Sequence, residues 1–271
     1  RHHISSGATE AITDAQEANF FECMTTMSYL AAKTKDIQIG VACLVMPLRN
    51  PIYAAKQCAT IDHLCDGRLL VGVGLGSKAT RESSEFDVFE VSEKSRGNRT
   101  DEYIEAMKAI WTQPMASYEG KFLKFDNAEI HPKPLQKPHP PVWVGGWMDQ
   151  AAVRAGRYGE GWIPGWLSPK EMARGCDILR KAATDAGRDP AGIKIAVEKL
   201  AAIARTRDEA MTLALPTIRE SSQTYERDVD NIQFALDRHI IGSVDDVRRR
   251  IDEFIEAGVQ HFELKLIYPD M

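Results

Sequence analysis

The chain has 271 residues, of which 44% are hydrophobic and 27% charged, and its formal net charge is −5 at pH 7. These values are ordinary for one large or two small globular domains, and nothing in them indicates a basic surface, so we do not expect nucleic acid as a partner. No apolar run approaches the roughly 20 residues of a membrane span, and the start lacks the pattern of a signal peptide. The five cysteines are scattered without a C-x-x-C pair. We therefore expect reduced thiols, no metal site and a cytoplasmic protein.

One pattern repeats along the chain: a short apolar run, then an amphipathic stretch of helical periodicity. Several runs are apolar at nearly every position, which is typical of strands buried on both faces of a parallel sheet. We expect strands at 37–45, 68–75, 141–145, 160–165, 193–204 and 260–267. The alternation predicts an α/β fold, but it does not distinguish an open doubly wound sheet from a closed barrel.

Helices are expected at about 15–34 and 99–113, and capping signals mark the others. Asn50-Pro51 places an N-cap residue before a proline at the first helical position. Further start and stop signals are Ser168–Glu171, Thr206–Glu209, Ser243–Asp246, Gly187 and Gly258.

Residues 114–141 interrupt the alternation. A strand-like pair around Glu119-Gly120 opens this segment, and a proline-rich run that excludes helix closes it. We interpret it as a surface excursion before the strand at 141–145, and residues 1–271 as a single domain.

The stretch "LLVGVGLGS" at 69–77 ends a strand in three glycines, Gly72, Gly74 and Gly76. A dinucleotide fingerprint requires a glycine where Ser77 stands and a helix that begins inside the motif. The polar segment that follows has no helical periodicity, so this fingerprint is excluded. Two explanations stay open: a tightly packed turn, or side-chain-free backbone against which a large flat ligand lies.

At this point the chain resembles a known family. The segments "MPLRNPIYAAKQCATIDHLCDGRLLVGVGLG", "RGNRTDEYIEAMKAIWT", "HPKPLQKPHPPVWVGG" and "DRHIIGSVDDVRRRIDEFIEAGVQHFEL" are similar, in order and spacing, to the bacterial-luciferase-like family. That resemblance implies a (β/α)8 TIM barrel and a flavin- or F420-dependent oxidoreductase. It also implies that the family's first strand, first helix and most of its second strand lie outside this numbering.

The resemblance suggests several roles near the start of the chain and after the glycine motif. His2 matches a histidine that some F420-dependent relatives use in catalysis, and a terminal or tag residue is the alternative. Ser77 stands where those relatives have a glutamate, which argues against sugar-phosphate dehydrogenation by that acid/base pair. Thr80 falls where those relatives place an amide that contacts the cofactor.

Further cofactor contacts follow from the resemblance. In relatives, a bulge or a non-proline cis peptide supports one face of the flavin, and the matching residues here are Ala42, Cys43 and Val45. Gly74 and Gly76 would lie under the ring.

The phosphate would bind where a strand ends and a helix begins. Glycines let backbone N–H groups converge on an anion, and a helix N-terminus adds about half a positive charge. The family's phosphate positions correspond to Gly145, Gly146, Gln150 and Ala151, with a plain turn as the alternative. Asp149 would repel a phosphate unless it is turned outward.

Four other residues have two interpretations each. Trp162 and Trp166 either wall the pocket or pack in the core or rim. Glu198 and Lys199 either point into the pocket mouth or mark the end of their strand, because a buried pair of charges is costly.

The sequence therefore predicts an oxidoreductase that uses reduced FMN and O2 on a small organic substrate. Hydride transfer with coenzyme F420 is the alternative. A non-redox phosphate-binding barrel and a catalytically silent flavin-binding protein also stay open. Expected partners are the substrate, the flavin, a flavin reductase and further copies of the chain, with no nucleic acid or membrane.

Overall fold

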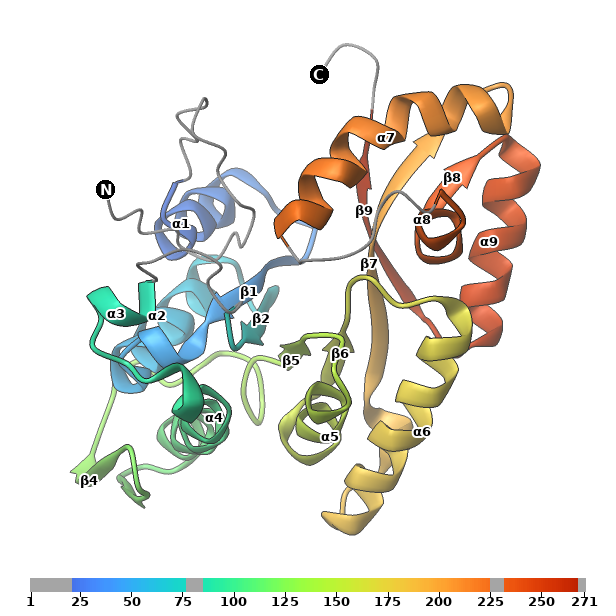
Figure 1. The fold of residues 1–271 in the computed structure, drawn as a ribbon. Coiled ribbons are helices and arrows are strands. Elements are labelled where there is room, and N and C mark those ends of the chain that lie inside the picture. The colour runs from blue at the N-terminus through green and yellow to red at the C-terminus, as the bar shows by residue number, and fades with distance from the viewer. Residues whose placement is uncertain (1–20, 77–84, 225–231, 268–271) are drawn as a thin grey trace. The chain divides into compact units, whose positions relative to one another are not determined.

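The computed structural model describes residues 21–76, 85–224 and 232–267. The described residues up to Gly145 form one compact unit, and those from Gly146 onward form a second. Each unit is built from parallel strands joined through helices (Figure 1). The single domain expected from the sequence stays a prediction.

The first unit is built around three parallel strands. Its elements, in chain order, are α1 (Cys23–Lys33), β1 (Ile39–Val45), η1 (Met46–Leu48), α2 (Pro51–Leu64), β2 (Leu69–Gly74), α3 (Glu85–Val88), η2 (Glu93–Ser95), α4 (Arg96–Thr112), β3 (Ala116–Glu119), β4 (Lys124–Ala128) and β5 (Val142–Gly145). Strand β2 lies between β1 and β5, and both pairs are parallel. The side chains of Leu69, Val71 and Val73 in β2 are all buried. These alternate residues lie on one face of the strand, and Gly72 on the other face is buried as well, which explains the apolar run in the sequence.

Local signals position the helices of this unit. The Asn50 side chain accepts hydrogen bonds from the backbone N–H groups of Ile52 and Tyr53, at 3.0 and 3.2 Å, so the expected cap at α2 is confirmed. Helix α1 is shorter than the expected 15–34, because Glu22 caps its start by accepting a bond from the Thr25 N–H at 2.8 Å. Residues 15–20 of that prediction lie outside the described part.

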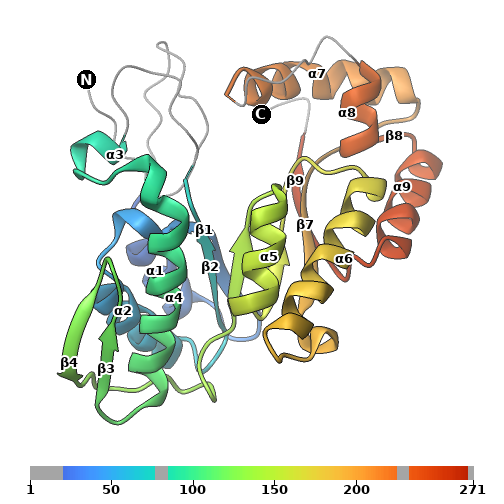
Figure 2. The same ribbon diagram turned by 60° about the horizontal axis from the view of Figure 1, so that its bottom comes forward.

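The excursion contains the expected strand pair. Strands β3 and β4 form an antiparallel hairpin that lies along α4 (Figure 2). Glu102 of α4 accepts bonds from the turn N–H groups of Lys121 and Phe122, at 3.1 and 2.8 Å. The proline-rich run is held by Asp62, a fully buried residue of α2 whose carboxylate accepts two bonds from Gln136, at 2.7 and 2.9 Å. The excursion is therefore fastened to the helices beneath it.

The second unit is built around β7. Its elements are α5 (Asp149–Tyr158), β6 (Gly161–Ile163), α6 (Pro169–Asp185), η3 (Pro190–Gly192), β7 (Lys194–Ile203), α7 (Arg207–Thr224), α8 (Ile232–Arg238), β8 (Ile240–Gly242), α9 (Val244–Glu256) and β9 (His261–Leu266). Strands β6, β8 and β9 all pair with β7 in parallel. Strand β8 was not expected, because a run of three residues carries no periodicity to recognise.

The capping signals of this unit are largely confirmed. Ser168 and Ser243 each form a complete capping box, at the starts of α6 and α9. Gly187 and Gly258 follow α6 and α9 with φ values of +70° and +103°, as glycines after a helix do.

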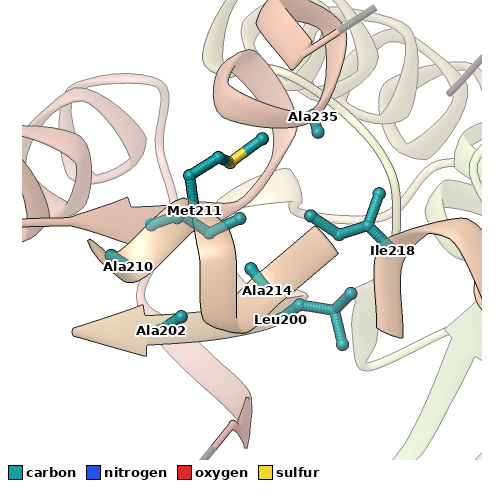
Figure 3. Packing of buried hydrophobic residues seen from close by; sticks show 8 residues of the cluster. Leu200, Ala202, Ala210, Met211, Ala214, Ile218 and Ala235 are labelled. Carbon is teal, nitrogen blue, oxygen red and sulfur yellow. The ribbon is translucent and has the colours of Figure 1, made fainter. Parts of the chain in front are cut away.

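A cluster of apolar residues, half of them alanines, joins β7 to α7. Side chains of Leu200 and Ala202 face α7 (Figure 3). They pack with Ala210, Met211, Ala214, Ile218, Ala235 and Ile241. The many alanines let α7 approach the strand closely, so this face of β7 is covered by helix.

Candidate cofactor site

Strand β1 is irregular at the positions expected to support a flavin. In the strand register, Val41 pairs with Val71 of β2 and Leu44 pairs with Val73. Three residues along β1 therefore span the same length as two residues along β2. The peptide bond between Ala42 and Cys43, inside this bulge, is cis. The expected bulge or non-proline cis peptide is therefore present. Ala42 is exposed, Cys43 half-buried and Val45 buried.

The glycines at the ends of β2 and β5 converge on Cys43. A Cβ atom at Gly74 would lie 3.1 Å from the Cys43 Cβ, and one at Gly145 would overlap the Cys43 sulfur. A Cβ at Gly72 would overlap the carbonyl oxygen of Val41, so that glycine permits close approach of the two strands. The tips of β2 and β5 thus carry no side chains around Cys43. The cysteine takes part of the space that the sequence assigned to a ring.

Gly76 has a structural role of its own. Its φ is +74°, and a Cβ there would lie 2.9 Å from Val45 and 3.2 Å from Phe86. Arg96 donates a hydrogen bond to its carbonyl at 3.3 Å. Contact between Gly76 and a cofactor stays a prediction. His2 and Thr80 lie outside the described residues.

The turn from Gly146 into α5 has the backbone geometry of an anion-binding loop. Gly146 has a φ of +118°, and a Cβ there would lie 3.0 Å from the Ala151 Cβ. Met148, the N-cap residue of α5, makes no side-chain capping bond, in contrast to the N-cap residues of α2, α6 and α9. The partial positive charge of this helix end is therefore not offset by a capping side chain. Gln150 is exposed there and Ala151 buried.

Asp149 is turned away from an anion by a partner. Its carboxylate accepts two bonds from the Arg174 guanidinium of α6, at 2.6 and 2.9 Å. These hydrogen bonds and the charge of Arg174 lower the pKa of Asp149. The carboxylate and guanidinium neutralise each other, which resolves the conflict that Asp149 raised in the sequence.

Trp162 holds the Gly146 turn from behind. Its side chain is 1% exposed, and its indole N–H donates to the Gly146 carbonyl at 3.0 Å. The ring packs closely on Gly175 of α6. Trp162 is therefore a core residue rather than a pocket wall. Trp166 is buried as well, edge-on to the ring of His239 at 4.6 Å.

Glu198 and Lys199 have different environments. Glu198 is exposed, whereas Lys199 is 1% exposed and donates from Nζ to the Leu167 carbonyl at 2.7 Å. Burial lowers the pKa of Lys199 to about 7. Neither expected interpretation of Lys199 fits, since it points into the protein from the middle of β7.

Glu263 is a feature that the sequence reasoning missed. It is the register partner of Glu198 on β9, so the two carboxylates lie on the same face of neighbouring strands. Partial loss of hydration, together with the Glu198 charge, raises the pKa of Glu263 to about 7. The available signal was a glutamate within each of two expected strands. Across residues 21–76, 85–224 and 232–267, no cluster of His, Cys, Asp or Glu is arranged to hold a metal ion.

The chain is similar to known oxidoreductases. The model of the family described as luciferase-like monooxygenase matches residues 2–261. An FMNH2-dependent dimethylsulfone monooxygenase from Pseudomonas putida is 32% identical over 204 residues, which are 75% of this chain and 54% of that protein. The chain spans about half the length of the curated relatives it matches. None of the described helices is long and apolar enough to cross a membrane.

Solved structures share the fold. A monooxygenase from Streptomyces bottropensis superimposes with a TM-score of 0.77 at 25% identity, over 92% of this chain and 76% of that one. An F420-dependent secondary alcohol dehydrogenase superimposes with a TM-score of 0.79 at 21% identity, over 94% and 82%. The expected fold class, a luciferase-like (β/α)8 barrel, is confirmed. Because the family model covers almost the whole chain, the protein belongs to the luciferase-like monooxygenase family of oxidoreductases.

Proposed function

We propose that this chain uses reduced FMN and O2 to oxygenate a small organic substrate. The observation that carries the proposal is its 32% identity to the FMNH2-dependent dimethylsulfone monooxygenase. One oxygen atom would enter the substrate and the other would leave as water, while FMNH2 loses two electrons and two protons. Reduced FMN, when bound, supplies the electrons that activate O2.

The ring of the flavin would be supported by backbone. Gly74 and Gly145 carry no side chains, and Cys43 takes part of the space beside them, so a flat ligand would lie against Cys43 and the bulge at Ala42. Val45, buried behind Gly76, would hold this turn in shape. The half-buried thiol of Cys43 would be the side chain closest to such a ring.

The phosphate would bind at the start of α5. Gly146 is in the left-handed region, α5 begins without a side-chain cap, and Asp149 is neutralised by Arg174. The backbone N–H group of Gln150 would donate to a phosphate oxygen, as the first N–H groups of a helix do. The Ala151 N–H donates to the Met148 carbonyl at 2.8 Å, so Ala151 would line the phosphate site without donating to it. His2 and Thr80 stay in the proposal as a proton-transfer residue and a cofactor contact.

Coenzyme F420 is the second candidate, because two solved structures with this fold are F420-dependent enzymes. Its poly-glutamate tail favours a basic groove. Two arginines that could line such a groove already have other partners: Arg96 bonds the Gly76 carbonyl, and Arg99 bonds Tyr103 and stacks on Phe122. This observation favours FMN.

Equilibrium binding tests the proposal. FMN, riboflavin and F420 are titrated into the protein, and we expect the phosphate of FMN to give at least tenfold tighter binding than riboflavin, about 1.4 kcal/mol. Gly146→Ala should abolish this difference between FMN and riboflavin. Gly187→Ala is the matched control, because Gly187 is also left-handed but has open space around it. Tighter binding of F420 than of FMN would replace the first candidate by the second.

A turnover assay addresses the other classes. The protein is supplied with NADH, a flavin reductase, FMN and a panel of sulfones and aldehydes that includes dimethyl sulfone. Oxygenated product supports the monooxygenase. Flavin binding without product favours a catalytically silent protein, and binding of sugar phosphates without flavin favours a non-redox barrel. The flavin reductase, the homo-oligomer and the cytoplasmic location remain part of the proposal.

A further inference from the structure

Lys199 is a buried charged group that the proposed chemistry does not use. It lies in the middle of β7, is 1% exposed, and its ammonium group stands 4.9 Å from the centre of the Phe254 ring. A methionine of similar length would fill this space without a charge to bury. What the amine adds is a hydrogen bond of 2.7 Å to the carbonyl of Leu167.

That bond holds one end of the loop at 164–168, which joins β6 to α6. The other end is held by the preceding residue of β7, because the Glu198 N–H donates to the Pro164 carbonyl at 3.1 Å. Two consecutive residues of one strand thus fasten both ends of the loop. Ser168, which closes the loop, is itself fixed as the N-cap of α6.

Between these anchor points the loop carries a bulky residue in a strained conformation. Trp166 has a φ of +46°, which disfavours large side chains. It is nevertheless 8% exposed and packs edge-on against His239 at 4.6 Å. A residue keeps such a conformation only where its surroundings determine it. Here the surroundings include the two anchored loop ends.

The place of the loop gives this arrangement a function. The loop leaves the carboxyl end of β6, and in βα barrels the loops at this end of the strands form the substrate side. We propose that Lys199 is a positioning residue that fixes the 164–168 loop and the Trp166 indole, and that it thereby sets which substrates the site accepts. The substrate half of this proposal rests on the proposed oxidoreductase function, whereas the positioning half does not.

The positioning half is tested on the protein without cofactor. Three proteins are compared: wild type, Lys199→Met and Lys199→Arg. For each, the emission spectrum of the same protein with Trp166→Phe added is subtracted, and the difference is the fluorescence of Trp166. A charge-assisted bond of this kind shifts the equilibrium between a held and a released loop by roughly tenfold or more. We therefore expect red-shifted, acrylamide-accessible Trp166 emission in Lys199→Met. Lys199→Arg, which still donates to a carbonyl, should keep the buried emission.

A general loss of stability would also shift the emission of the other tryptophans, and an unchanged spectrum of the Trp166→Phe proteins excludes it. Lys199→Gln, which is too short to keep the bond, gives the same test if the methionine variant does not fold. Unchanged Trp166 emission and quenching in the folded variant would overturn the positioning role.

The substrate half is tested by turnover. Lys199→Met should raise the KM of the best substrate by roughly tenfold, the size of the lost bond, while FMN affinity stays within about twofold. An unchanged KM would overturn the substrate half. If wild type binds neither FMN nor F420, the proposed function fails while the fluorescence result still decides the positioning role.

Discussion

The substitution Lys199→Met should make the protein more stable at neutral and acidic pH. Burial lowers the pKa of Lys199 from its ordinary value of 10.5 to about 7. The charges of Glu198 and Glu171 partly oppose this effect, whereas those of Arg238 and Arg250 add to it. The folded protein therefore holds this proton less tightly than the unfolded chain does.

The sign and size of the effect follow from proton linkage. Between pH 7 and pH 10.5 the unfolded chain binds the proton and the folded protein does not, so the free energy of unfolding rises with pH. Below pH 7 both states bind it, and the full penalty applies. The two pKa values differ by about 3.5, and each pH unit corresponds to about 1.36 kcal/mol, so the penalty is about 5 kcal/mol. The substitution by methionine removes this penalty, but the loss of the hydrogen bond to the Leu167 carbonyl lowers the free energy of unfolding by about 1–3 kcal/mol.

Urea denaturation of both proteins at pH 6, 7, 8 and 9 measures the balance. We expect the methionine variant to be more stable by about 2–4 kcal/mol at pH 6, and this advantage to fall by about 1.4 kcal/mol per pH unit above pH 7. Titrating groups far from Lys199 cancel in the difference. Lys194→Met, an exposed position on the same strand, is the control and should show no such trend. A stability difference independent of pH would refute the reasoning.

Three further predictions follow from the described contacts. Asp62→Ala should lower the free energy of unfolding by about 3 kcal/mol in denaturation, because it removes a buried carboxylate that two part-buried donors of Gln136 contact. The exposed Asp185→Ala should cost under about 0.5 kcal/mol, and equal effects would contradict the role of burial. Trp162→Phe should weaken FMN binding more than riboflavin binding in titrations, because it frees the Gly146 carbonyl from its donor; an equal loss for both ligands would argue against a phosphate site at this turn. Asp149→Asn should tighten FMN binding, because it leaves the arginine charge uncompensated, and the gain should shrink as salt is added; weaker binding at low salt would show that the carboxylate is not neutralised as described.

The periodicity of the sequence was sufficient to predict the regular elements. Strands β1, β2, β5, β6, β7 and β9 all lie within the expected ranges. In β2, β5 and β6 most residues are buried, which explains their short apolar runs. The capping boxes at Ser168 and Ser243 could be predicted because a cap is a local interaction over four residues. Strand β8 could not be predicted from the sequence, because it forms only by pairing with Ala201 and its neighbours in β7.

The candidate site was predictable only in part, for a physical reason. Glycines at 74, 145 and 146 stand out in a sequence, but what their missing side chains make room for depends on the neighbouring strand. The sequence suggested open space for a ring at Gly74, whereas Cys43 lies beside this glycine and takes part of that space. The burial of Lys199 depends on Phe254 and Leu167, which are far away along the chain. No local pattern reports such contacts.

The most direct test of the proposed function is a competition between cofactors. The protein is equilibrated without oxygen with equal concentrations of reduced FMN and reduced F420, passed through a desalting column, and analysed by mass spectrometry for the retained cofactor. Our account predicts retained FMN, and its loss in Gly146→Ala. Retention of F420 alone, or of neither molecule, would contradict it.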